Sequence, residues 1–355
     1  MGEQYPVVQV NIDALRHNGE ILHGLCDTKG ISVAGSLKFC NGNLILGAAA
    51  FDGICNQYAL SRTVHLKKLK AMYPDKQVIY TQCPMRQDME AVVKYADITM
   101  QFRPETLFAM DQTASKCGVQ AGVLLMMRDG NVSELVECAK ITKKLSHLQV
   151  KGVGIYRNGF RDEVPTGQAM YALAEGVDLA EQILELPMEI VSAGHSLDVL
   201  LNLGEERLPE RVNHILLGSS VANPQWLLSK QANLDLRTDA LQLIAETLEI
   251  HEKKQTKHGA ANLNRCRRAV LALGKQDFGN ADNAEPTDGG AVIVGCSDDR
   301  MVVELSREKC MLKAGETLSF RLNFAGMQRA FTSQEMAVAY CYDSNNTVLH
   351  EKDRD

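Results

Sequence analysis

A lysine follows directly after a short apolar run near the start of the chain. The run Ile31–Leu37 contains only apolar or small residues, and the chain then reaches Lys38 and breaks at Asn41-Gly42. Such a run predicts a strand that is buried on both faces, as in a parallel sheet. Because an ammonium group is costly to bury, this lysine either extends into water or has a lowered pKa that serves chemistry. A neutral lysine amine is suited to forming a Schiff base.

Later apolar runs also end in residues that could bind a ligand. Tyr156 ends one run, and two further runs end in Ser192-Ala-Gly-His195-Ser196 and in Leu216-Leu-Gly218-Ser219-Ser220. Small residues and hydroxyl groups let backbone N–H groups approach an anion. An early lysine combined with two such turns is the layout that a pyridoxal phosphate site needs.

The elements that would position these residues alternate along the chain. About eight short apolar runs are separated by segments with helical periodicity, which is typical of a parallel (β/α)₈ barrel. The predicted strands are Ile31–Leu37, Gly53–Tyr58, Gln77–Tyr80, Ile98–Gln101, Gly122–Met127, Val150–Ile155, Met188–Val191 and Val212–Leu217. The predicted helices are Thr63–Met72, Arg86–Tyr95, Pro104–Cys117, Val132–Leu145, Gly167–Leu186 and Leu197–Gly204. In such a barrel the functional groups gather at the C-terminal ends of the strands.

The sequence pattern changes after Trp226. Short runs bounded by Gly, Asn, Asp and Pro then predict a smaller, mostly antiparallel β domain. The predicted strands are Ala240–His251, Arg268–Leu273, Ala291–Val294, Met301–Leu305, Thr317–Leu322 and Met336–Tyr342, the first of which could equally be a helix by periodicity. We therefore expect a barrel domain over 12–235 and a C-terminal β domain over 236–355, with residues 1–11 as a candidate extra strand of the latter.

Composition excludes several classes of protein. The 355 residues are 45% hydrophobic and 23% charged with a net charge of −6, and the 38 basic residues are scattered, which argues against nucleic acid or an anionic membrane as partner. Asp52 interrupts the longest apolar run, so no transmembrane span is expected. The N-terminus has no signal-peptide pattern, which favours the cytoplasm. The ten cysteines are spread singly without a Cys-x-x-Cys pair, so reduced thiols and no metal cluster are predicted.

Several motifs together point to one enzyme family. The segments are Val10–Asn18, Lys38, Leu60–Leu69, Ser192–Ser196, Arg211–Gly218, Arg268–Asp277, Gly295–Val303 and Phe320–Gly326. In this order, and over nearly the whole chain, they resemble the fold-type III pyridoxal-phosphate enzymes. The resemblance is greatest to the two-domain amino-acid racemases of the ornithine racemase and alanine racemase type. It implies a (β/α)₈ barrel with a C-terminal, mostly antiparallel β domain.

The resemblance also implies a cofactor, pyridoxal 5'-phosphate, and residues that hold it. The residues assigned in this way are Lys38, Tyr156, His195, Ser196, Gly218 and Ser219. Lys38 falls where the family places its Schiff-base lysine, which also acts as a base on one face of the substrate. Ser196 and the backbone amides near Gly218 would hold the phosphate, and Tyr156 would lie against the cofactor ring.

Racemisation requires a second acid/base on the opposite face. In the alanine racemases a tyrosine of the partner subunit has this role, and Lys275 stands at the matching place here. Cys296, Asp298 and Asp299 are alternatives, since decarboxylase relatives place a catalytic cysteine in this region. The acidic residues could instead bind a cationic substrate side chain. A homodimer with shared active sites is therefore expected.

Three positions depart from the family pattern. Leu216 occupies the place of an arginine that faces the pyridine nitrogen, Phe324 replaces a tyrosine, and Arg128 replaces an aspartate.

We expect a pyridoxal-phosphate-dependent racemase that interconverts L- and D-amino acids, with an ornithine-, lysine- or alanine-like substrate. The alternatives are a decarboxylase or aldolase of the same fold and a cofactor-binding protein with little or no turnover.

Overall fold

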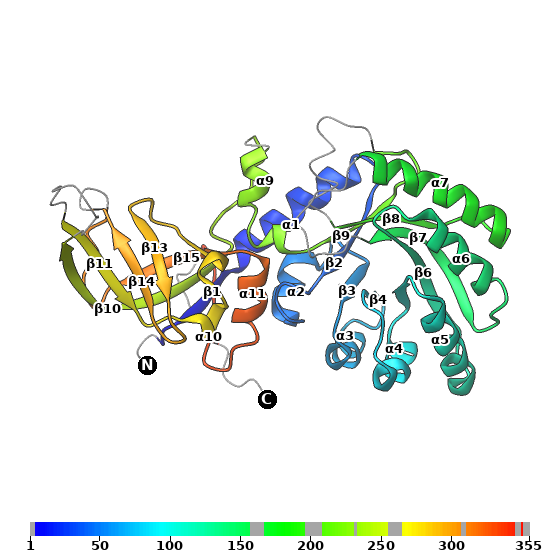
Figure 1. Cartoon of the computed structure of the whole chain (residues 1–355), viewed down its shortest axis with the longest axis horizontal. Coiled ribbons are helices and arrows are strands. Elements are labelled where there is room, and N and C mark those ends of the chain that lie inside the picture. Colours follow the sequence, from blue (N-terminus) through cyan, green and yellow to red (C-terminus); the bar gives the residue numbers. More distant parts are fainter. Residues whose placement is uncertain are drawn as a thin grey trace.

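The computed structural model contains a parallel barrel and a second, mostly antiparallel sheet, which confirms the expected fold class (Figure 1). The residues that it describes are 4–156, 167–195, 208–230, 233–254, 265–306, 310–344 and 349–350. The predicted helix Leu197–Gly204 lies outside them.

Eight parallel strands close the barrel in sequence order. They are β2 (Ser32–Ser36), β3 (Gln57–Leu60), β4 (Gln77–Tyr80), β5 (Ile98–Gln101), β6 (Ala121–Arg128), β7 (Leu148–Tyr156), β8 (Ile190–His195) and β9 (His214–Leu217). Closure occurs where β2 pairs with β9 as well as with β3. Strand β3 begins at Gln57, whereas the sequence pattern predicts a start at Gly53. The reason is that Gly53, with φ at +81°, and the turn to Cys55 first end helix α2.

Helices cover the outside of the barrel. They are α1 (Ile12–Asp27), α2 (Leu44–Phe51), α3 (Leu66–Met72), α4 (Met89–Tyr95), α5 (Pro104–Cys117), α6 (Val132–Thr142) and α7 (Gly167–Leu184), with short 3₁₀ helices η1 (Thr63–His65), η2 (Arg86–Asp88) and η3 (Ser219–Val221). The short helix α9 (Gln225–Lys230) follows η3 in the chain and projects away from this ring of helices in Figure 1. The apolar run that Asp52 interrupts is α2, and the side chain of Asn43 caps its first turn. Most of its apolar residues, though not the exposed Ile45, belong to the main hydrophobic core, so burial explains this apolar run.

Small and apolar side chains fill the inside of the barrel. This interior cluster consists of Ala34, Ala59, Ile79, Ile98, Met100, Leu124, Met126 and Leu216. A packed interior of this kind makes the barrel a solid core. The ligand site must therefore lie at one end of the strands.

A buried hydrogen-bond network ties the last barrel strands to the first ones. His214 is fully buried, and its Nδ1 lies 3.0 Å from Ser192 Oγ while its Nε2 lies 3.0 Å from Gln57 Oε1. The backbone N–H of Gly194 donates to Ser192 Oγ at 3.3 Å. Since the Gln57 oxygen can only accept, Nε2 carries the proton and Nδ1 accepts from the serine hydroxyl. This network fixes β8 near its C-terminal end, at Ser192 and Gly194.

The second sheet combines strands from both ends of the chain. Its strands are β1 (Val7–Asn11), β10 (Leu241–Lys254), β11 (Arg265–Leu271), β12 (Ala284–Pro286), β13 (Ala291–Cys296), β14 (Met301–Leu305), β15 (Thr317–Leu322), β16 (Ala337–Cys341) and β17 (Leu349–His350). Its helices are α10 (Lys275–Phe278), α11 (Phe324–Ala330) and the 3₁₀ helix η4 (Ala281–Asn283). β1 lies between β10, to which it is antiparallel, and β16, to which it is parallel. The segment at Ala240–His251, which was ambiguous by periodicity, is therefore a strand.

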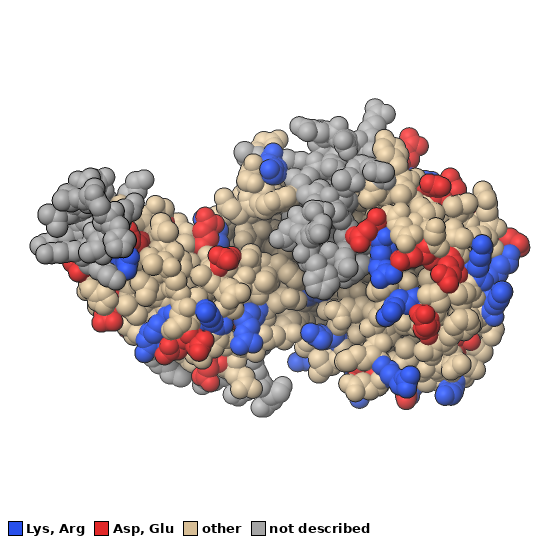
Figure 2. Space-filling model, in the orientation of Figure 1, with Lys and Arg blue, Asp and Glu red and all other residues tan. Residues whose placement is uncertain are grey.

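Membrane spans, metal-ligating groups, disulfides and charged patches would each bear on the class of protein. In the described part of the chain, no helix is long and apolar enough to cross a bilayer, and no group of three or more metal-ligating side chains is found. Every cysteine whose side chain is described is a free thiol. Figure 2 shows acidic and basic side chains interspersed over the outer helices of the barrel on the face in view.

His214 predicts a specific pH dependence of stability. Burial lowers its pKa from 6.5 to about 4, so the folded protein holds the neutral ring and the unfolded chain takes up a proton more readily. The stabilisation is complete above pH 6.5 and is lost as the pH falls towards 4. We expect a loss of roughly 3 kcal/mol across this interval by urea unfolding. His214→Asn should lack this component, and equal pH slopes in both proteins would refute the assignment.

Candidate active site

Lys38 lies in a tight turn immediately after β2. The N–H of Gly42 donates to the carbonyl of Leu37 at 2.9 Å, and Asn41 and Gly42 have φ values of +48° and +74°. A Cβ on Gly42 would stand 2.6 Å from Cγ of His65, so only glycine fits against that ring. The Asn-Gly pair therefore makes the turn that leaves Lys38 at the C-terminal edge of the barrel.

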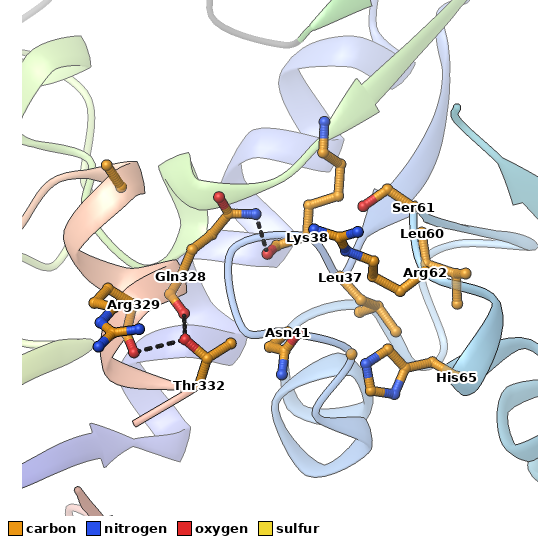
Figure 3. Close-up of a pocket in the computed structure, with 12 residues that line it drawn as sticks. Leu37, Lys38, Asn41, Leu60, Ser61, Arg62, His65, Gln328, Arg329 and Thr332 are labelled. Carbon is orange, nitrogen blue, oxygen red and sulfur yellow. Dashed lines mark hydrogen bonds between the residues drawn. The ribbon is translucent and has the colours of Figure 1, made fainter. Parts of the chain in front are cut away.

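The amine of Lys38 is partly removed from water. Burial lowers the pKa of this amine below the ordinary lysine value. Among the described residues it has no carboxylate partner, and its Nζ lies 6.0 Å from the centre of the Phe324 ring. Figure 3 shows the side chain extending away from His65 and Thr332. A lysine with this environment is more often neutral, and hence more nucleophilic, than an exposed lysine.

The second sheet and its helices hold the turn of Lys38 in place. The Gln328 side chain on α11 donates to the Lys38 carbonyl at 3.1 Å, as Figure 3 shows. Asn43, which caps α2, donates to the Tyr340 hydroxyl on β16 at 2.9 Å. Two parts of the protein that are distant in sequence therefore fix the same turn.

The expected phosphate turn is adjacent to Lys38 in space. β9 pairs with β2, and Gly218 follows β9, with its Cβ position only 3.4 Å from Cβ of the buried Ser36. Ser219 then begins η3. A turn of small residues such as this one lets backbone N–H groups approach a small anion.

Three other sequence-predicted cofactor residues are described only in part. Tyr156 and His195 are the last residues of β7 and β8. Because the barrel strands are parallel, the backbones of these two residues lie at the same end of the barrel as Lys38. Ser196 lies outside the described residues. The C-terminal ends of β2, β7, β8 and β9 therefore lie at one end of the barrel. The contacts of the Tyr156, His195 and Ser196 side chains stay predictions.

The candidates for the second acid/base form a separate cluster. Lys275 begins α10, and its N–H donates to the Ser297 carbonyl at 2.9 Å. Cys296 ends β13, and Asp298 and Asp299 lie exposed in the turn that follows. Lys275 is exposed as well. Among the described residues, no hydrogen bond or ion pair joins this cluster to Lys38.

The three departures from the family pattern have clear surroundings. Leu216 is 4% exposed and packs in the barrel interior, so its neighbourhood is apolar. Phe324 stands beside the Lys38 amine. Arg128 makes hydrogen bonds through Nε and Nη2 to Glu134 at 2.9 and 2.5 Å, and it lies over the Phe102 ring.

Other residues near Lys38 escaped the sequence reasoning. A pocket of about 350 Å³ adjoins the turn and is lined by Arg62, His65 and Gln328 among others. Arg62 follows β3 by two residues, so the rule that identified Lys38 could have found it. Gln328 gives no such signal, because only the packing of α11 brings it to the barrel.

A known protein is similar to this chain over almost its whole length. No family model matches the chain. It is 27% identical over 350 residues to the ornithine racemase of Acetoanaerobium sticklandii, covering 93% of this chain and 98% of the relative.

Solved structures with the same fold include several enzymes. An alanine racemase from Clostridium difficile 630 has a TM-score of 0.70 at 16% identity and matches over 98% of both chains. A D-threonine aldolase from Filomicrobium marinum has a TM-score of 0.73 at 13% identity, over 97% of this chain and 93% of that chain. The resemblance to the ornithine racemase and alanine racemase type is confirmed by these findings, and the structural matches by themselves establish the fold.

The lowered pKa of Lys38 can be measured directly. When the free protein is labelled with acetic anhydride at a series of pH values, the Lys38 peptide should reach half of its maximal rate at a lower pH than a free lysine side chain. The reason is that the neutral amine reacts and burial favours it. Mass spectrometry of the peptides gives the profile. A midpoint equal to that of the free side chain would show that Lys38 is fully solvated.

Proposed function

We propose that this protein is an amino-acid racemase of the fold-type III group, which interconverts L- and D-amino acids with pyridoxal 5'-phosphate bound at Lys38. The observation that carries the proposal is the partly desolvated amine of Lys38 at the barrel mouth, beside the small-residue turn after β9. The similarity to an ornithine racemase over nearly the full chain supports it.

The residues at the barrel mouth fit this cofactor. Lys38 has a lowered pKa and no acidic partner among the described residues, as an amine that attacks an aldehyde requires. Gly218 and Ser219 would hold the phosphate through backbone N–H groups, together with Ser196. Tyr156 would lie against the ring, and His195 directly precedes Ser196 in the sequence. When bound, the cofactor supplies an electron sink that makes the substrate Cα–H acidic.

Lys38 has a second task in this proposal. Once the substrate has displaced it, its amine takes up or returns the Cα proton on one face. Burial lowers the pKa of this amine and so favours the neutral form, which is the form that can accept a proton. The turn that Gln328 and Asn43 hold keeps this amine oriented.

A second chain would complete the site. Among the described residues, Lys275 and the neighbouring Cys296 and Asp298 make no hydrogen bond or ion pair to Lys38. Lys275 and Asp298 are exposed, and Cys296 is partly exposed. A homodimer in which one chain presents this cluster to the Lys38 of its partner would provide the acid/base for the opposite face. We assign this role first to Lys275.

Leu216 defines the surroundings of the cofactor further. Its buried, apolar environment offers no charged partner to a pyridine nitrogen at that place. The chain would therefore control the reaction mainly through the orientation of its own acid and base groups.

The same proposal divides the chain into a barrel over 12–235 and a C-terminal domain over 236–355. It also places the protein in the cytoplasm, where the free thiols would stay reduced.

The role of Lys38 can be tested by covalent trapping. Borohydride reduction of the cofactor-loaded protein should attach the cofactor to the Lys38 peptide, and Lys38→Ala should lose both this attachment and the yellow colour. Lys67→Ala, which changes an exposed lysine of α3, is the control. A tag on another lysine, or none, would refute the proposed mechanism.

The role of Lys275 can be tested by racemisation in deuterated water. Lys275→Ala should slow the loss of optical rotation by about 100-fold or more, because one face would lack its acid/base. Lys313→Ala, an exposed lysine of the same part of the chain, should have no effect. An unchanged rate in Lys275→Ala would transfer the role to Cys296 or Asp298.

An aldolase is the second candidate, since a D-threonine aldolase shares the fold. A screen of D- and L-amino acids by chiral chromatography separates the two functions. An aldolase would release an aldehyde from a β-hydroxy amino acid, a decarboxylase of this fold would release carbon dioxide, and a racemase would release neither.

A further inference from the structure

A pocket of about 350 Å³ lies between the loops that follow β2 and β3 and the helix α11 (Figure 3). On one side it is lined by the turn of Lys38 and by the segment from Leu60 to His65. On the other side it is lined by Gln328, Arg329 and Thr332. It is therefore formed jointly by the barrel and by the helix that covers its mouth.

The lining of this pocket favours an anion. It contains no aspartate or glutamate, and its polar groups include Asn41, Ser61 and Gln328, which can donate hydrogen bonds. The Thr332 hydroxyl already donates to the backbone carbonyls of Gln328 and Arg329. The Arg62 side chain extends from the end of β3 towards Lys38 and Gln328 in Figure 3. Within the described residues, Arg62 has neither a hydrogen bond nor an ion pair through its guanidinium group.

Arg62 and Arg329 are the two guanidinium groups of the pocket lining, and both stay charged over the ordinary pH range. Burial and the nearby Lys68 lower the pKa of His65, so its ring is neutral at pH 7. Burial also favours the neutral form of Lys38. Arg329 lies at the far wall, where its charge acts on the carboxyl group of Asp277. A single guanidinium with free donors matches a single carboxylate in charge and geometry.

We propose that Arg62 binds the carboxylate group of the amino-acid substrate, with Asn41 and Gln328 as neighbouring donors. This assignment rests on the proposed function, since it requires the substrate to react at Lys38. Lys38 and Arg62 both line the pocket, and the Arg62 side chain extends towards Lys38 in Figure 3, so Arg62 borders the space that a substrate reacting at Lys38 would enter. A charge-assisted bond of this kind contributes about 10- to 100-fold to affinity.

The experiment compares amino acids with amines that lack only the carboxylate. The cofactor-loaded protein is titrated with L-ornithine and 1,4-diaminobutane, and with L-alanine and ethylamine. The change in cofactor absorbance gives the concentration at half-saturation. The variants are Arg62→Met, Arg62→Lys and the control Lys67→Met, which alters an exposed lysine of α3 that does not line the pocket.

The expected result is a loss of discrimination. Arg62→Met should raise the half-saturating concentration of the amino acids by about 10- to 100-fold and leave that of the amines within about twofold. Arg62→Lys should have a smaller effect, because one ammonium replaces a two-pronged guanidinium. Lys67→Met should match the wild type.

Two outcomes would overturn the assignment, and they differ from a failure of the proposed function. If Arg62→Met changes neither class of ligand, or weakens both equally, then Arg62 does not bind the carboxylate. In both cases the wild type still responds to amino acids and keeps the cofactor at Lys38. If the wild type takes up no cofactor, or does not respond to amino acids, the proposed function and this assignment fail together.

Discussion

The partial removal of one amine from water is the constraint on which the candidate site depends. An ammonium group resists burial, so the protein must hold Lys38 in place by other interactions. The Asn41-Gly42 turn does so locally, through its left-handed backbone and its fit against His65. Helix α11 does so from a distance, through the hydrogen bond of Gln328 to the Lys38 carbonyl. The same packing places the Phe324 ring beside the amine and lowers the pKa of that amine.

The barrel provides the second half of the arrangement. Closure between β2 and β9 makes the first and the last strand neighbours, so a lysine from the beginning of the barrel meets a small-residue turn from its end. The network from Gln57 on β3 through His214 on β9 to Ser192 on β8 links three strands of the barrel. Small residues such as Gly218 and Ser36 then leave room for a ligand where the two strands end. The stability of the barrel and the geometry of the site therefore depend on the same contacts.

The differences from related enzymes concentrate around this site. Leu216 brings an apolar side chain to a place where the related racemases have a charge, and Arg128 is paired with Glu134 at the other side of the mouth. The fold alone does not select a reaction, since racemases and an aldolase share it. The reaction depends instead on which acid and base groups reach the substrate. In the proposed reaction this group would be Lys38 on one face, and on the other it would come from the exposed cluster around Lys275.

The sequence by itself determined the barrel, the second sheet, and the placement of Lys38 and Gly218 at strand ends. These features follow from local patterns, namely the alternation of buried runs with helices and the turns that end each run. The tertiary structure decided the rest. It inserted β1 between β10 and β16, brought Gln328 and Phe324 to Lys38, joined Arg62 to the same pocket, and kept Lys275 apart from it. Contacts between residues hundreds of positions apart leave no trace in local periodicity, so only the packing of the folded chain could reveal them.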